Sequence, residues 1–272
     1  MRGIGVTAAI TRSIPEAAVP LLLAVTALGD PVFVAVLATL VYWVGPRYDL
    51  LDRREGAAVV AATYVALAAT LLLKTGFSLP RPPASVMLIA EDGAGFPSGH
   101  ATGATATYAA LAVYLERGRP RVRYALGVAA FAIVAASRVL LGVHYLVDVV
   151  AGIAVGLAIL GVVRAVARES LTWAFAMAVP LALGGALLHA TVEAALQVGL
   201  VTGAAVGWWL VRDRLDGTGP ARSTVVLALV GGGLLAGAGY ESGMPIVAGF
   251  TGLATGALFL ALPALQSQNV SR

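Results

Sequence analysis

Three short strings contain most of the side chains in this sequence that suit phosphate chemistry. They are Lys74-x6-Arg81-Pro82, Pro97-Ser98-Gly99-His100 and Ser137-Arg138-x5-His144-x3-Asp148. The chain has one lysine, 3 histidines and no cysteine, and the lysine and two of the histidines fall inside these strings. A chain so short of reactive groups does not gather them between residues 74 and 148 for packing alone. Imidazoles, a carboxylate and cations together can bind a phosphate group and transfer it.

His144 and Asp148 are four residues apart, so on a helix they share one face. A carboxylate beside an imidazole accepts from one ring N–H and leaves the other nitrogen basic. That arrangement suits a nucleophilic histidine. The same pair could instead satisfy polar groups between membrane helices, and the pair alone does not decide between the two interpretations.

The string Ser98-Gly99-His100 follows Pro97 and opens an apolar run. A helix N-terminus offers free backbone N–H groups and a positive dipole end, which suit phosphate oxygens. Gly99 would let an anion approach the backbone closely, and Ser98 could cap the helix or bond a substrate oxygen. The alternative is an ordinary serine cap followed by a histidine at the membrane interface.

Three cations, Lys74, Arg81 and Arg138, have no obvious partner nearby in the sequence. Lys74 ends an apolar run, where a lysine also commonly extends to the interface. Arg81 stands between two prolines, which stiffen its backbone. Three cations around one dianion would hold it and offset charge in a transition state for phosphoryl transfer.

Composition places the chain in a membrane. It has 272 residues, 59% hydrophobic and 12% charged, whereas soluble domains carry roughly 25% charged residues. The mean hydropathy is +0.89. The net charge of +4 is small and gives no continuous basic face, so we expect no nucleic-acid partner. The absence of cysteine excludes disulfides and thiolate metal sites.

The apolar runs predict an all-α, polytopic transmembrane bundle. A bilayer core needs about 20 apolar residues per helix. The candidate segments are residues 14–29, 31–45, 57–75, 98–116, 123–142, 146–166, 171–190, 191–211, 223–240 and 244–264. The first two are short, and one of them could be re-entrant, with Gly29-Asp30-Pro31 as the turn.

Arginines assign the sides of the membrane. They cluster in four loops, near residues 47–54, 117–123, 164–168 and 212–222. With the segments above, these loops share one face, which the positive-inside rule makes cytoplasmic, together with both termini. All three strings border the opposite loops, at residues 76–96 and 142–143. We therefore expect a multi-pass cell-membrane protein with its site on the extracytoplasmic side.

The complete pattern K-x6-RP, PSGH and SR-x5-H-x3-D resembles the type 2 phosphatidic acid phosphatase (PAP2) superfamily. Every fixed position of that signature is present, in order. The resemblance covers about residues 14–168 and implies the family's six-helix core. We therefore expect a catalytic core at residues 1–168 and a membrane extension of about four helices at residues 169–272.

The resemblance also implies roles for the residues. It makes His144 the nucleophile, Asp148 the group that orients it, and His100 the acid that protonates the leaving oxygen and later activates water. The residues it assigns to phosphate binding are Lys74, Arg81, Ser98, Gly99 and Arg138. It implies no metal and no cofactor. The family includes soluble vanadium-dependent haloperoxidases, but the hydropathy of this chain argues against that branch.

The expected activity is hydrolysis of a lipid phosphate or diphosphate, such as phosphatidic acid or polyprenyl diphosphate. A site at the interface can admit a headgroup while the tails stay in lipid. Two alternatives remain: a phosphotransferase that uses the same site, and a transporter or scramblase. A transporter would place its polar groups near the bilayer midplane. Residues 169–272 could form a lateral wall, a homo-oligomer interface or a second functional unit.

Overall fold

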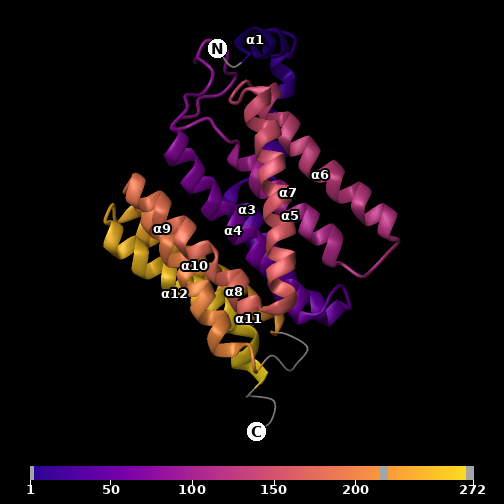
Figure 1. Ribbon diagram of the computed structural model, residues 1–272, viewed down its shortest axis with the longest axis vertical. Coiled ribbons are helices and arrows are strands. Elements are labelled where there is room, and N and C mark those ends of the chain that lie inside the picture. The colour runs from indigo at the N-terminus through magenta and orange to yellow at the C-terminus, as the bar shows by residue number, and fades with distance from the viewer. Residues whose placement is uncertain (1–2, 215–219, 268–272) are drawn as a thin grey trace.

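The computed structural model describes residues 3–214 and 220–267, and these ranges form helices without strands. Figure 1 shows an elongated bundle, with the later helices grouped along one side. The α-helices are α1 (Ile4–Arg12), α2 (Val19–Ala27), α3 (Pro31–Val44), α4 (Arg53–Phe77), α5 (Gly99–Tyr114), α6 (Pro120–Leu140), α7 (Leu146–Glu169), α8 (Leu171–Ala176), α9 (Ala178–Leu188), α10 (Val192–Val211), α11 (Arg222–Glu241) and α12 (Pro245–Ser267). Two 3₁₀ turns, η1 (Glu16–Ala18) and η2 (Gly45–Tyr48), join the early helices.

Within the described ranges, 8 helices are long and apolar enough to cross a membrane. They correspond to α3 with η2, α4, α6, α7, α8 with α9, α10, α11 and α12. Helix α5 has 16 residues, which is slightly short of the usual length of a span. The expectation of an all-α, polytopic membrane bundle is therefore confirmed.

The first expected segment, residues 14–29, contains η1 and α2 and follows α1 after a sharp bend. Pro15 precedes η1, Pro20 lies at the start of α2, and the α1 and η1–α2 helices are bent by 95°. Proline causes such breaks because it lacks an N–H and clashes with the preceding turn. The segment ends beside α5, where a Cβ on Gly29 would lie 3.3 Å from the His100 carbonyl oxygen. It therefore remains at the end of the bundle that carries the motif loops.

Helix α3 is the first helix to run away from the motif residues. It leads to the opposite end of the bundle, which we call the arginine-rich end because Arg47, Arg53 and Arg54 lie there. Its Val34 lies near Gly103 of α5, and its Tyr42 packs against Gly56 at the start of α4. In consequence, α1 lies at the motif end and the last turns of α12 lie at the other end (Figure 1). The expected common side for both termini stays a prediction, because the terminal residues lie outside the described ranges. Which end faces the cytoplasm stays a prediction.

Helix α4 forms the centre of the bundle and presents Lys74 in its last turn. Its N-terminus is capped by Asp52, whose Oδ1 accepts the Glu55 N–H at 2.7 Å, while Glu55 Oε2 accepts the Asp52 N–H at 2.9 Å. The helix ends at Ser78 in a left-handed conformation, with φ 45°. Most of its buried residues are alanine and valine. Because these side chains are small, α3, α5, α7 and α9 can all pack against α4.

Close packing of α7 on α5 brings two of the three motifs together. Cβ atoms on Gly152 and Gly156 of α7 would crowd the backbone carbonyl oxygens of Ser98 and Thr102. Small residues allow this close approach between membrane helices. At the N-terminal ends of these two helices, the Ser98 N–H donates to the Asp148 carbonyl oxygen at 3.0 Å.

The C-terminal helices contact the rest of the chain through the packing of α8 and α9 on α4 and through the end of α12, which is hydrogen-bonded to α3. Trp43 Nε1 donates to the Phe259 carbonyl at 2.7 Å, and Tyr42 Oη donates to the Leu260 carbonyl at 3.0 Å. Pro263 lies inside α12 and has no N–H for the Phe259 carbonyl, so Trp43 supplies the missing donor. Both parts of the chain share one hydrophobic core. The division into residues 1–168 and 169–272 stays a prediction.

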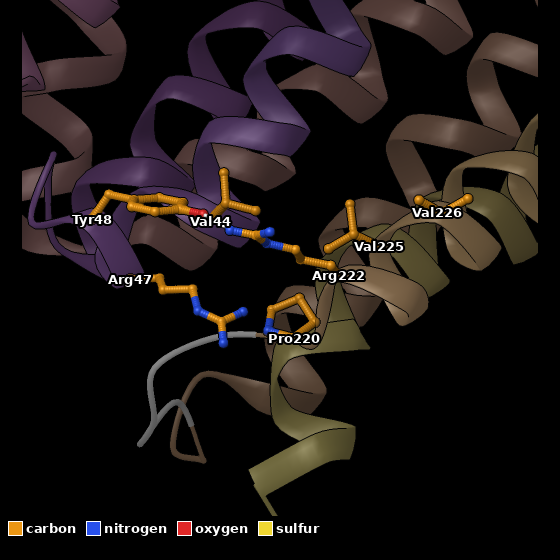
Figure 2. A pocket seen from close by; sticks show the side chains of 7 residues that line it. All are labelled: Val44, Arg47, Tyr48, Pro220, Arg222, Val225 and Val226. Carbon is orange, nitrogen blue, oxygen red and sulfur yellow. Dashed lines mark hydrogen bonds between the residues drawn. The ribbon is translucent and has the colours of Figure 1, made fainter.

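A cavity of about 230 Å³ lies at the arginine-rich end, where η2 meets the start of α11. Figure 2 shows Arg47, Tyr48 and Arg222 gathered around it. Arg222 Nη2 donates to Tyr48 Oη at 3.3 Å. This cavity is at the opposite end of the bundle from the motif residues, so it has no part in their chemistry.

The tight contact between α10 and α12 yields a stability test. A Cβ on Gly203 would overlap the Leu253 carbonyl oxygen, whereas a Cβ on Gly231 of α11 would meet nothing within 4 Å. We expect Gly203→Ala to destabilise the fold by about 1–3 kcal/mol, because overpacking forces the backbones apart. Thermal unfolding of the detergent-solubilised protein measures this effect.

Gly231→Ala is the matched control, since it adds the same methyl group in open space and favours the helix slightly. Its unfolding midpoint should equal or exceed that of the wild type. An equal midpoint for Gly203→Ala and Gly231→Ala would contradict the α10–α12 contact described here.

Candidate active site

The structure brings the three strings together at one end of the bundle. Lys74 comes from the last turn of α4, Arg138 from the last turn of α6, and His100 from the first turn of α5. Arg81 belongs to the loop between α4 and α5, and His144 to the turn between α6 and α7. The remaining expected residues, at the start of α5 and of α7, are Ser98, Gly99 and Asp148.

Two hydrogen bonds set the tautomer of His144. Its Nδ1 lies 2.7 Å from the Gly95 carbonyl oxygen, which can only accept, so Nδ1 carries the hydrogen. Its Nε2 lies 3.0 Å from Arg81 Nη1, which can only donate, so Nε2 carries the lone pair. The imidazole is therefore neutral, and its acceptor nitrogen faces a guanidinium group.

Burial keeps this imidazole uncharged. The His144 side chain is only 1% exposed. Burial lowers the pKa of His144 to about 4; Asp148 opposes this shift, and Arg81 and Arg138 add to it. At neutral pH the ring thus keeps the Nε2 lone pair that a nucleophile requires.

Asp148 stands beside the ring, but it is not the nearest acceptor. Its Oδ2 lies 3.7 Å from His144 Nδ1 and accepts the Tyr145 N–H at 3.0 Å.

The Gly95 carbonyl accepts the Nδ1 hydrogen bond, although the sequence did not single Gly95 out. Its own N–H donates to the Leu79 carbonyl at 2.7 Å, and a Cβ there would press on the Arg81 backbone. A larger residue would have to push this backbone aside, so glycine suits the position.

Arg81 and Arg138 converge on a carboxylate that the sequence analysis did not identify. Arg81 Nη2 lies 2.9 Å from Glu91 Oε1, and Arg138 Nη2 pairs with Glu91 Oε2. Burial alone would raise the pKa of Glu91, but the charges of Arg138 and Arg81 outweigh it and lower the pKa. Glu91 is therefore ionised at neutral pH.

One sequence signal could have found Glu91. Between Glu55 and Glu116 the chain has only two acidic residues, Glu91 and Asp92. They stand in the loop between the first two motifs, close in sequence to cations that otherwise lack partners. An isolated acid in such a loop predicts an ion pair with those cations.

Other contacts fix the two arginines in place. Arg81 Nε donates to the Asp92 carbonyl at 2.9 Å, and Arg81 Nη1 donates to the Val143 carbonyl at 3.0 Å. Arg138 Nη1 donates to Thr26 Oγ1 at 2.9 Å. The Arg138 Nε atom is buried without a hydrogen-bond partner. The site thus contains a buried donor available to an additional acceptor.

The start of α5 completes the cluster. Ser98 is fully buried and caps the helix, with its Oγ accepting the Ala101 N–H at 3.4 Å. A Cβ on Gly99 would lie 3.6 Å from Lys74 Cε, so the lysine side chain passes close to this helix N-terminus. His100 is within electrostatic range of both Glu91 and His144. The cluster therefore combines an acceptor nitrogen, three cations and a second imidazole.

The fold and this cluster define a polytopic membrane protein with a buried histidine in a cationic site. Residues 55–172 match the model of the PAP2 superfamily, so this part of the chain is a PAP2 superfamily domain. The expected resemblance to this superfamily is therefore confirmed for residues 55–172. This superfamily includes phosphatases that act on phosphate esters. Comparisons with curated proteins and with solved structures give no match.

The matched region extends from the start of α4 to the start of α8 and includes every motif residue. The match begins later than the expected resemblance, which started at residue 14, so α1 to α3 lie outside the matched region. The roles of the individual motif residues are not tested by this match and stay predictions.

The tautomer of His144 can be measured without any substrate. With ¹⁵N-labelled histidine, nuclear magnetic resonance should report an Nδ1–H tautomer for His144 at pH 7. The ring should stay neutral as the pH falls below its ordinary pKa of about 6.5, because the folded state lowers the pKa to about 4.

The His144→Ala variant assigns the signal, since the chain has only 3 histidines. A cationic ring at pH 7, or an Nε2–H tautomer, would contradict the geometry of the Gly95 and Arg81 contacts.

Proposed function

We propose that this chain is a membrane phosphatase that removes the terminal phosphate of a lipid phosphate or diphosphate through a phosphohistidine at His144. One observation carries the proposal: the His144 Nε2 lone pair lies 3.0 Å from Arg81 Nη1, in a cluster that also contains Lys74 and Arg138. A neutral nucleophile beside anion-binding cations is the arrangement that phosphoryl transfer requires.

In the first step, His144 Nε2 attacks phosphorus, and the bond from phosphorus to the leaving oxygen breaks. The negative charge of the bound phosphate favours the protonated form of His100, which donates its proton to that oxygen. The cations Lys74, Arg81 and Arg138 offset the charge on the transferring group. The imidazole becomes positively charged when Nε2 forms its bond to phosphorus, and the nearby Asp148 carboxylate stabilises that charge.

In the second step, water attacks the phosphohistidine. The now neutral His100 takes a proton from the water, and the bond between Nε2 and phosphorus breaks. The electron pair returns to Nε2, and inorganic phosphate leaves. His144 is neutral again and His100 is protonated, so the site is restored for another turnover.

A lipid substrate is supported by the position of the cluster. All of its members come from helix ends and from the loops that join them, and the surrounding helices suit a bilayer. A headgroup could reach the cluster while its tails stay among lipids. The arginine-rich loops lie at the other end, which supports an extracytoplasmic site in the cell membrane.

The direct test is phosphate release by the detergent-purified protein in the presence of EDTA. We would offer phosphatidic acid and a polyprenyl diphosphate separately. We expect wild-type protein to release phosphate from at least one of them and His144→Ala to release none. His189→Ala is the matched control, because His189 ends α9 outside the motif cluster, and it should retain wild-type release.

Normal release by folded His144→Ala protein would overturn the proposed nucleophile. A wild-type protein that releases no phosphate, but transfers it to an added alcohol, would instead be a phosphotransferase using the same site. Vanadate should inhibit either reaction, because its five-coordinate form resembles the transition state.

Asp148→Asn separates charge from geometry. Asparagine keeps an oxygen for the Tyr145 N–H, and Gly95 still accepts from His144 Nδ1. We therefore expect the tautomer of His144 to survive while turnover falls by about 100-fold or more, because the positive phosphohistidine loses its counter-charge. Turnover measurements combined with the histidine spectrum test this. An unchanged turnover would mean that Asp148 only caps α7.

A further inference from the structure

The carboxylate of Glu91 uses the donors that a bound phosphate would need. Both of its oxygens are engaged, one by Arg81 Nη2 at 2.9 Å and the other by Arg138 Nη2. Carboxylate and phosphate groups bind guanidinium donors in the same paired manner. A phosphate cannot take these two donors while Glu91 holds them.

We propose that Glu91 is an internal competitor for the phosphate site, which a ligand must displace from Arg81 and Arg138, and that it thereby excludes singly charged phosphodiesters. This inference rests on the proposed function, since it assumes that the two arginines bind the substrate's phosphate. It adds a residue that determines which phosphates can enter.

Of the three side chains Glu91, Arg81 and Arg138, the one that can move out of the site is Glu91. Its side chain is 26% exposed, whereas those of Arg81 and Arg138 are 7% and 2% exposed. The two arginines also keep contacts that do not involve Glu91, to backbone carbonyls and to Thr26 Oγ1. Glu91 belongs to the connection between α4 and α5, so rotating its side chain toward solvent breaks no helix.

The charge of a phosphate group determines whether it can replace Glu91 in the site. A phosphodiester carries one negative charge, so exchanging it for the Glu91 carboxylate adds no charge to the site. A terminal phosphate carries up to two, and Lys74 is within electrostatic range to pair with the second. Membrane lipids are mostly phosphodiesters and surround the protein at high concentration. A site with three cations and no internal carboxylate would be filled by them.

The test is direct binding of inorganic phosphate to the detergent-purified protein, measured by titration calorimetry. We expect Glu91→Gln to bind phosphate about tenfold more tightly than the wild type, because a charge-assisted pair no longer competes. Glu91→Ala removes the side chain altogether and should bind at least as tightly. Glu16→Gln removes one exposed charge in η1 that pairs with neither arginine, and it should match the wild type.

A second titration uses a short-chain phosphatidylglycerol as the phosphodiester. It should compete with phosphate in Glu91→Gln and have no effect in the wild type at the same concentration. Equal or weaker phosphate binding by Glu91→Gln and Glu91→Ala would overturn the inference and reduce Glu91 to a support for the arginines. That result would leave the phosphatase proposal standing, because wild-type protein still binds phosphate. No phosphate binding by any of the proteins would overturn both.

Discussion

Two guanidinium groups buried at the end of a membrane bundle are the constraint on which the site depends. A buried charge is costly unless it is paired and hydrogen-bonded, and ionisable groups within membrane helices are correspondingly rare. Apart from the unpartnered Nε of Arg138, Arg81 and Arg138 meet this requirement through one shared carboxylate and several fixed acceptors. The acceptors come from α2, from the loop before α5 and from the turn before α7. Pairing the arginines therefore ties three separate segments of the chain together.

The same constraint explains how far the site could be predicted. Hydropathy is a local property, so the apolar runs placed α4 and the later helices to within a few residues of their observed ends. The convergence of the motifs also followed, since helix order puts their loops at one end. Gly95 and Thr26 were missed because a backbone carbonyl and a single hydroxyl carry no distinctive residue pattern. Their roles exist only once the chain has folded.

The start of the chain shows the limit of hydropathy more directly. Residues 14–29 are apolar, but hydropathy does not predict that η1 and α2 turn away from α1 by 95° and end beside α5. Pro15 lies at that bend and permits it, but tertiary contacts select it: Thr26 supplies an acceptor to Arg138, and the Leu28 carbonyl accepts from Tyr108 Oη at 2.8 Å. Neither contact is visible in the sequence, since each joins residues about eighty or more apart.

The surroundings of His144 divide two tasks that one carboxylate often performs alone. The Gly95 carbonyl holds Nδ1–H and thus sets the tautomer, while Asp148 lies 3.7 Å away as a buried negative charge. A carbonyl oxygen cannot take up the proton, so the tautomer does not depend on the protonation state of an acid. In the proposed reaction, the Asp148 charge counts most when Nε2 has bonded to phosphorus and the ring is positive. The Asp148 carboxylate would then stabilise the phosphohistidine intermediate more than the resting enzyme. Such preferential stabilisation of the charged ring lowers the barrier to forming it.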